Sequence, residues 1–339
     1  METAMAVRER QLFPWLWLAT AATVFFVVVT ELFGESKDWE NYNTIFESLR
    51  VFGREGEDEG RIELGFKWLS TALISLSLPN ILVYAVIAAG SVLVKCYAIN
   101  FLCRNRAAFA WAVSFMLICF TPLHELTQLR AATAIAVLFL AYVALQNERY
   151  WLAVFLCLAA IIFHVSSVVV LPAILLLVVF ARDLFALTRI KAILMGSAVY
   201  LAGVVLIAIL LDSFGDLSLV VSVYQEEGFG FERLNPFSAS VVLNLGMTLL
   251  GLLLWNSITP NMRYVLLFQM FGTAVFYSTI EFQVIAQRVF ELFQVFWVFY
   301  VADGEQSEDF FVRYSTRLYV IAATAAYSYI YFFSRAFFL

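Results

Sequence analysis

Apolar stretches of about twenty residues recur along this chain, and no other feature of the sequence restricts its fold so strongly. A helix rises about 1.5 Å per residue, so about 20 apolar residues cross the hydrocarbon core of a bilayer, which is about 30 Å thick. Eleven stretches approach this template, although several are shorter: 12–30, 80–101, 107–122, 131–146, 150–163, 165–180, 192–211, 239–256, 264–280, 289–302 and 316–333. The sequence therefore predicts an all-α polytopic membrane protein with a single domain over 1–339.

The composition excludes a water-soluble globule. Of the 339 residues, 63% are hydrophobic and 14% are charged, whereas a soluble chain averages about 25% charged residues. Such a chain is solvated by membrane lipids. The formal net charge is −5 and no basic tract is present, so nucleic acid is not an expected partner.

The distribution of Lys and Arg indicates the orientation. If the stretches alternate in direction, eleven basic residues of the short loops lie on one side and four on the other. Because basic loops stay in the cytoplasm, we expect a multi-pass protein of the cytoplasmic (inner) membrane with its N-terminus inside. The first stretch, 12–30, has features of a signal peptide, but we expect a retained anchor.

Two segments are expected on the outer, periplasmic side. The stretch 31–65 carries ten acidic residues, and the apolar piece 66–78 that follows is separated from the next stretch by Pro79-Asn80. For the topology to hold, 66–78 must be a re-entrant or interfacial helix, so 31–79 forms an acidic outer region. The second outer loop is 212–238.

Polar side chains near membrane spans are the default candidates for function, because they are costly unless they face a cavity. They collect on the expected outer side, and Lys95 is explained by snorkelling to the inner surface. This pattern favours a site that opens at the outer leaflet. The candidates are Asp38, Glu63, His124, Glu125, Arg130, His164, Arg233, Glu281 and Arg288.

Arg130 and Arg288 are each expected at the start of a helix. An arginine there opposes the positive end of the helix dipole unless an anion binds beside it. A phosphate group fits, since a guanidinium binds its oxygens in a bidentate manner. The alternative is a pair of headgroup-level arginines partnered by lipid or by Glu125 and Glu281.

His164 follows an apolar run and precedes two serines. A neutral imidazole there could take a proton from a hydroxyl group, or hydrogen-bond a pyrophosphate or a sugar. The alternative is that it only satisfies a helix end. We expect His124 to be structural.

Two carboxylates differ from the solvated acidic run 55–59. Asp38 adjoins Trp39 and precedes Tyr42 at helical spacing, and Glu63 leads into an apolar piece. Aromatic faces beside carboxylates are typical of carbohydrate binding.

No nucleotide-binding or metal-binding motif is present. The chain has no GxGxxG, GxxxxGK[ST], HExxH or GxSxG sequence, and its four cysteines lack CxxC spacing. We expect no cofactor, no metal and no disulfide.

Four pieces of sequence occur in a characteristic order: Asp38-x-x-x-Tyr42-x-x-x-Phe46, Glu63-x-Gly65-Phe66-x-x-Leu69, Gln128-x-Arg130-x-x-x-Ala134 and Phe163-His164-x-Ser166. Together they resemble the EpsG family of Wzy-like polysaccharide (O-antigen, exopolysaccharide) polymerases. Arg288-Val289-Phe290 resembles the C-terminal arginine of that family, and the segment around Tyr224 resembles its periplasmic loop. The resemblance extends from about residue 30 to about residue 302.

The resemblance implies a glycosyltransferase-C-like or Wzy-like architecture and a glycosyltransferase that joins polyprenyl-diphosphate-linked oligosaccharide repeats at the outer face of the membrane. Donor and acceptor are then lipid-linked glycans, a chain-length regulator is a possible partner, and the diphosphate lipid is the leaving group. Its residue roles would be diphosphate binding by Arg130, Arg288 and Arg233, base catalysis by His164, then Asp38, then Glu63, and sugar contacts by Trp39, Tyr42 and Tyr224.

Two other classes remain open. A lipid-linked oligosaccharide transporter (flippase) would also be polytopic with outward arginines, and a membrane O-acyltransferase would rely on His164.

Overall fold

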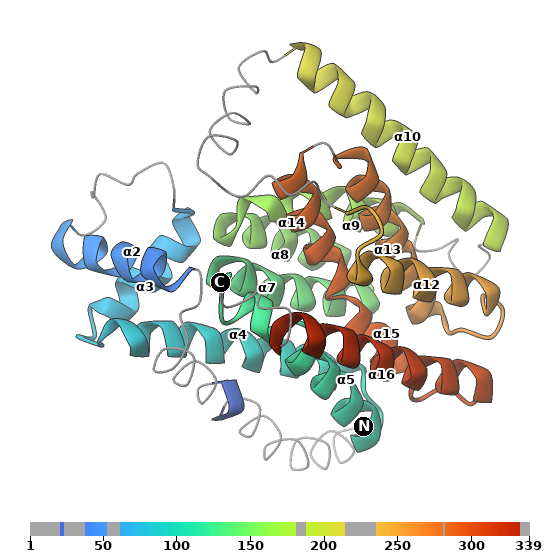
Figure 1. The fold of residues 1–339 in the computed structure, drawn as a ribbon, viewed down its shortest axis with the longest axis horizontal. Coiled ribbons are helices and arrows are strands. Elements are labelled where there is room, and N and C mark those ends of the chain that lie inside the picture. The colour runs from blue at the N-terminus through green and yellow to red at the C-terminus, as the bar shows by residue number, and fades with distance from the viewer. Residues whose placement is uncertain are drawn as a thin grey trace. The chain divides into compact units, whose positions relative to one another are not determined.

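The computed structural model describes residues 21–23, 38–52, 62–180, 188–213, 235–280 and 282–332, which form helices and contain no strand (Figure 1). The predicted all-α class is confirmed. Contacts group the chain into two compact units, Met1–Leu171 with Val320–Leu339, and Pro172–Tyr319. Most of the predicted stretch 12–30 and most of the loop 212–238 lie outside the described residues, and the single membrane domain stays a prediction.

The first unit contains the helices before residue 171, and α9 leads from it to the second unit. Their bounds are α2 Trp39–Phe52, α3 Leu64–Ile74, α4 Asn80–Leu102, α5 Arg106–Cys119, α6 Thr121–His124, α7 Leu129–Gln146, α8 Tyr150–Phe163, the 3-10 helix η2 Val165–Val169 and α9 Val170–Phe180.

α7 is the central helix of this unit. It packs against α4 on one side and α8 on the other (Figure 1). A tight turn at 147–149 joins α7 to α8, and Glu148 adopts a positive φ of 59° there. Because α7 and α8 are antiparallel neighbours, the first residue of α7 and the last of α8 lie at the same end of the hairpin.

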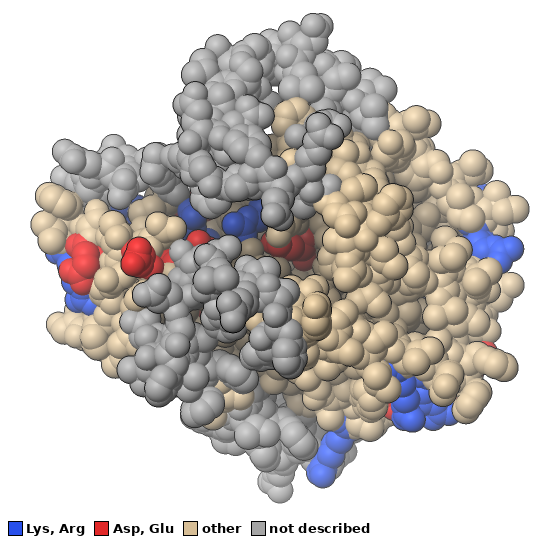
Figure 2. All heavy atoms as spheres, in the orientation of Figure 1, with Lys and Arg blue, Asp and Glu red and all other residues tan. Residues whose placement is uncertain are grey.

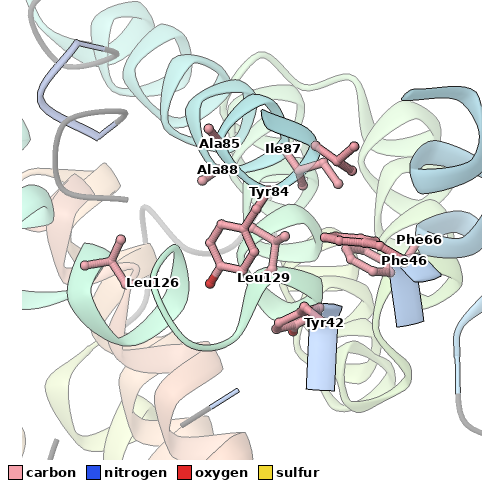
Figure 3. Close-up of a cluster of buried hydrophobic side chains, with 10 residues drawn as sticks. Tyr42, Phe46, Phe66, Tyr84, Ala85, Ile87, Ala88, Leu126 and Leu129 are labelled. Carbon is pink, nitrogen blue, oxygen red and sulfur yellow. The ribbon is translucent and has the colours of Figure 1, made fainter. Parts of the chain in front are cut away.

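α2 and α3 pack on each other through an aromatic cluster at the start of α4 and α7. Figure 3 shows Tyr42 and Phe46 from α2 with Phe66 from α3, beside Tyr84 of α4 and Leu129 of α7. These side chains are buried in one hydrophobic core. The predicted outer region 31–79 thus contributes two helices that cover this end of the hairpin.

The second unit is organised around α13, which contacts α10, α12, α14 and α15. A buried hydrogen-bond chain crosses it, in which Trp297 Nε1 donates to Asn244 Oδ1 (2.6 Å) and Asn244 Nδ2 donates to Thr273 Oγ1 (2.8 Å). The bounds are α10 Arg189–Ser213, α12 Ala239–Leu253, α13 Pro260–Ser278, α14 Gln283–Gln294, α15 Trp297–Gly304 and α16 Phe310–Phe332, which returns to the first unit.

Three segments are long and apolar enough to cross a membrane: Asn80–Leu102, Leu129–Gln146 and Ile285–Gly304. Five shorter apolar helices accompany them, and Figure 2 shows wide uncharged areas on the surface. The chain is therefore membrane-embedded, while the predicted total of eleven spans stays a prediction. α3 has 11 residues and a length of about 16 Å, too short to cross the core, as expected of a re-entrant or interfacial piece.

Candidate functional site

The α7–α8 hairpin brings Arg130 and His164 to the same end of the first unit. Arg130 is the second residue of α7, and His164 directly follows the last residue of α8. The backbone of His164 is extended, with φ −156° and ψ 113°, so α8 ends there before η2 begins. The predicted break at His164 and the predicted helix start at Arg130 are both confirmed.

Glu63 joins these two side chains. It precedes α3 and makes no cap hydrogen bond to its own helix. Instead, its Oε2 accepts a hydrogen bond from Arg130 Nη1 at 2.8 Å, and its Oε1 lies 3.1 Å from His164 Nδ1. The side chains of Glu63 and His164 are each 15% exposed and that of Arg130 is 31% exposed. The three groups therefore form a largely buried cluster in which the arginine can still be reached.

Two residues of α3 explain why Glu63 lies at the end of α8. A Cβ atom at Gly65 would come within 3.0 Å of the Ile162 carbonyl oxygen, so only glycine allows this close approach without a shift. Phe66 is fully buried and packs against Phe46 and Tyr42. Glycine thus sets the distance between α3 and α8, and phenylalanine anchors the helix.

The surroundings of Glu63 favour its ionised form. Burial alone would raise the pKa of this carboxyl, but the hydrogen bond from His164 and the charge of Arg130 outweigh burial and lower the pKa from 4.5 to about 2. An ionised carboxylate accepts hydrogen bonds, so Nδ1 of His164 carries the hydrogen. In the neutral ring, the lone pair is then on Nε2, the atom that can accept a proton.

Tyr42 lies behind Arg130. Its hydroxyl oxygen accepts a hydrogen bond from the backbone N–H of Arg130 (3.3 Å), one of the N–H groups that a helix start leaves without an intrahelical partner. Burial raises the pKa of this phenol, the Arg130 charge opposes that effect, and Asp38 adds to it. Tyr42 is 4% exposed, a position that suits holding α7 better than contacting a sugar. Trp39 is only partly buried and meets the Tyr84 ring edge-on at 5.3 Å.

For the other predicted site residues, a place at this cluster stays untested. Arg288 belongs to the second unit, and its convergence with Arg130 stays a prediction. The expectation that Arg288 opens a helix is wrong, because α14 begins at Gln283 and Arg288 is its sixth residue, 3.9 Å from Glu291 Oε2. Arg233, Tyr224 and Glu281 lie outside the described residues.

The expectation that Lys95 snorkels to the surface is also wrong. Its side chain is 3% exposed and forms an ion pair with Glu125, whose side chain is 1% exposed. Glu125 was named as a partner of Arg130 only in the alternative reading of the arginines, and the structure pairs Arg130 with Glu63. The sequence signal was Lys95 itself, a lone basic residue well inside an apolar stretch, which needs a counter-charge when it is buried.

The other polar groups in the part of the chain that the structure describes give no sign of a metal centre. Within the described ranges, no three His, Cys, Asp or Glu side chains could hold a metal ion together. Cys96, Cys103, Cys119 and Cys157 are all described, form no disulfide and are buried. His124 is buried and stacks on Phe120 with ring centroids 6.5 Å apart.

A model of the EpsG family matches residues 15–337, nearly the whole chain. No curated protein and no solved structure matches this chain.

Proposed function

Since the chain belongs to the EpsG family, which is associated with polysaccharide biosynthesis, we propose that it is a membrane glycosyltransferase of the Wzy type. It polymerises polyprenyl-diphosphate-linked oligosaccharide repeats at the outer face of the cytoplasmic membrane. Both donor and acceptor are lipid-linked glycans, and the diphosphate lipid leaves the donor. No nucleotide is needed, because the leaving group is already attached to the sugar.

The observation that carries this proposal is the bridge from Glu63 to both Arg130 and His164. A glycosyl transfer from a diphosphate requires a cation for the leaving group and a base for the acceptor hydroxyl. The Glu63 carboxylate holds Arg130, the candidate cation, and His164, the candidate base, at a fixed distance from each other. It also joins three of the four sequence pieces that resemble the family. Tyr42, from the remaining piece, binds the backbone N–H of Arg130.

In the proposed reaction, the acceptor oxygen forms a bond to the anomeric carbon of the donor. The bond from that carbon to the diphosphate oxygen breaks with its electron pair, and the acceptor proton passes to Nε2 of His164. The departing polyprenyl diphosphate gains one negative charge, which Arg130 stabilises by charge-assisted hydrogen bonds. Glu63 orients the imidazole and stabilises the imidazolium that forms.

This assignment changes the order of the candidate bases. A carboxylate with a pKa of about 2 whose two oxygens each face a partner is a weak base, so Glu63 positions His164 and does not take the proton. Asp38 remains the second candidate base. Arg288 and Arg233 remain proposed additional cations for the diphosphate, and Trp39 and Tyr224 remain proposed sugar contacts.

Product analysis tests the proposal. The purified protein is reconstituted in lipid vesicles with a defined polyprenyl-diphosphate-linked repeat, and the glycans are resolved by size. A ladder of longer glycans with release of polyprenyl diphosphate supports the polymerase. Unchanged lipid that moves between leaflets identifies a carrier. A mass gain of one acyl group, when an acyl donor is added, identifies an acyltransferase.

A further inference from the structure

A second buried polar cluster lies beside the proposed site. Lys95 of α4 pairs with Glu125 in the turn that precedes α7, and Ser91 of α4 donates a hydrogen bond to Glu125 Oε1 at 3.0 Å. Ser91 is 3% exposed, Lys95 2% and Glu125 1%. The proposed reaction uses none of these groups.

Stability alone does not explain this cluster. Replacing a buried ion pair with apolar residues of similar volume is often neutral or stabilising, because removing both charges from water is costly. In addition, Glu125 Oε2 is buried and has no hydrogen-bond partner among the described residues. A buried acceptor without a partner destabilises a fold. The cluster therefore calls for a role other than stabilisation.

The position of the cluster, next to the start of α7, suggests that it positions Arg130. Glu125 lies five residues before Arg130, and the Ser91 hydroxyl oxygen also lies 2.8 Å from the carbonyl oxygen of Ala132, two residues after Arg130, so both acceptors face its one hydrogen. α4 thus holds the chain on both sides of the arginine. From the α2 side, the Tyr42 hydroxyl binds the backbone N–H of Arg130 itself.

Apolar packing also fastens the turn before α7 to α4, between these polar contacts. Leu126 and Leu129 flank the turn into α7, and both are buried in the core that contains Tyr84 and Ala88 of α4 (Figure 3). Apolar contacts of this kind are non-directional, so they permit small shifts along the helix. An ion pair and hydrogen bonds with defined atoms fix the register of the turn.

We propose that Ser91, Lys95 and Glu125 are positioning residues that fix the start of α7, and with it the guanidinium of Arg130, for the departing diphosphate. This inference rests on the proposed function. A charged cluster formed by α4 and the turn before α7 then sets the rate of glycosyl transfer without touching the substrate.

The test is the double variant Lys95→Met/Glu125→Gln, assayed with the polyprenyl-diphosphate-linked repeat. Removing both charges avoids leaving one of them buried and unpaired. We expect a folded protein whose kcat falls about 100-fold, because a misplacement near 1 Å has that effect on a reacting geometry. The KM for the donor should stay within about threefold, since the extra charge on the diphosphate appears only as the bond breaks.

A matched control removes an ion pair of the second unit. Arg317 Nε donates to Glu305 Oε2 at 2.8 Å. Glu305 directly follows α15 and Arg317 lies in α16, whereas Arg288 lies in α14. Glu305→Gln/Arg317→Met should keep kcat within about twofold of the parent protein. Equal losses of kcat in the two double variants would overturn the inference, as would an unchanged kcat in Lys95→Met/Glu125→Gln.

Ser91→Ala provides a milder change if the double variant does not fold. It removes the hydroxyl group that faces both Glu125 and Ala132, while the ion pair remains. We expect about a tenfold lower kcat with an unchanged KM, and a parental kcat would overturn the inference. A parent protein that makes no glycan ladder would refute the proposed function itself, and the inference would fall with it.

Discussion

Glu63 is the residue on which the site depends. Its two carboxylate oxygens face side chains from two different helices, at 2.8 Å from Arg130 and 3.1 Å from His164. A glutamine has only one acceptor oxygen, so it can replace the carboxylate toward one of these partners but not toward both. Each of the three residues can therefore be tested by a conservative substitution.

The acid stability of the protein tests the ionised state of Glu63. The pKa of Glu63 is about 2 in the folded chain and about 4.5 without its partners. The stabilisation by the ionised form, on the order of 3 kcal/mol, is complete above about pH 4.5 and is lost as pH falls through about 2. Above about pH 5, we expect the thermal midpoint of the parent protein in detergent to exceed that of Glu63→Gln. The margin should shrink between pH 5 and 3, and a constant margin down to pH 3 would contradict the assignment.

Arg130 is tested by replacement with lysine. A point charge does not reproduce bidentate binding of a phosphate, so Arg130→Lys should lose nearly as much polymerising activity as Arg130→Ala, at least about 100-fold. The matched control is Arg106→Lys at the exposed start of α5, which should keep parental activity. Near-normal glycan ladders from Arg130→Lys would show that a positive charge at this position is enough for the reaction, and would contradict the need for bidentate binding.

At the scale of the helices, α3 is placed by Gly65. An alanine Cβ at this position would meet the Ile162 carbonyl oxygen at 3.0 Å, so α3 and α8 would have to separate by a few tenths of an ångström. That movement lengthens the contact between Glu63 and His164, which are carried by the ends of these two helices. The geometry of the site is thus coupled to the packing of one small residue.

The expected result for Gly65→Ala is a protein that folds well but transfers slowly. Alanine favours a helix over glycine by about 0.5–1 kcal/mol, which offsets the cost of the crowded contact. Activity should fall about tenfold, because the imidazole is no longer held in place. Gly90→Ala in α4 is the control, since nothing lies within 4 Å of its added Cβ atom. Equal activity in the two variants, measured by glycan ladders and thermal unfolding, would contradict the account.

The sequence allowed the helices to be predicted better than the contacts between them. Hydropathy placed the second span at 80–101, and α4 is Asn80–Leu102. The polar His164 between two apolar runs correctly marked a helix end. The start of α14 was missed because Gln283 and Gln287 are polar, whereas a helix can begin with polar residues before its apolar part.

The contacts of the site could be predicted only in part. The four family-like pieces identified Glu63, Arg130 and His164, but not that Glu63 bridges the other two across 67 and 101 residues of sequence. Such pairing depends on how α3 packs on α8, and no local pattern encodes that. The pairing of Lys95 with Glu125 was missed for the same reason.

For the molecule as a whole, the orientation in the membrane decides which side holds the site. The Lys and Arg asymmetry predicts residues 31–65, 123–130, 212–238 and 281–288 outside, and 102–106, 147–149 and 181–191 inside. The described native cysteines are buried, so an added one can be labelled against a low background. In intact spheroplasts, Asn41→Cys and Ser238→Cys should react with an impermeant thiol reagent and Asn147→Cys should not. The reverse pattern would rule out an outer-face site.

The most direct test of the central claim is the glycan ladder made by His164→Gln in vesicles with a defined polyprenyl-diphosphate-linked repeat. An amide can satisfy a helix end with similar hydrogen bonds but cannot take up the acceptor proton. The account predicts a protein that folds and inserts like its parent, with ladder formation at least about 100-fold slower. A ladder of parental length and rate from stably folded His164→Gln would contradict it, and the role of base would pass to Asp38.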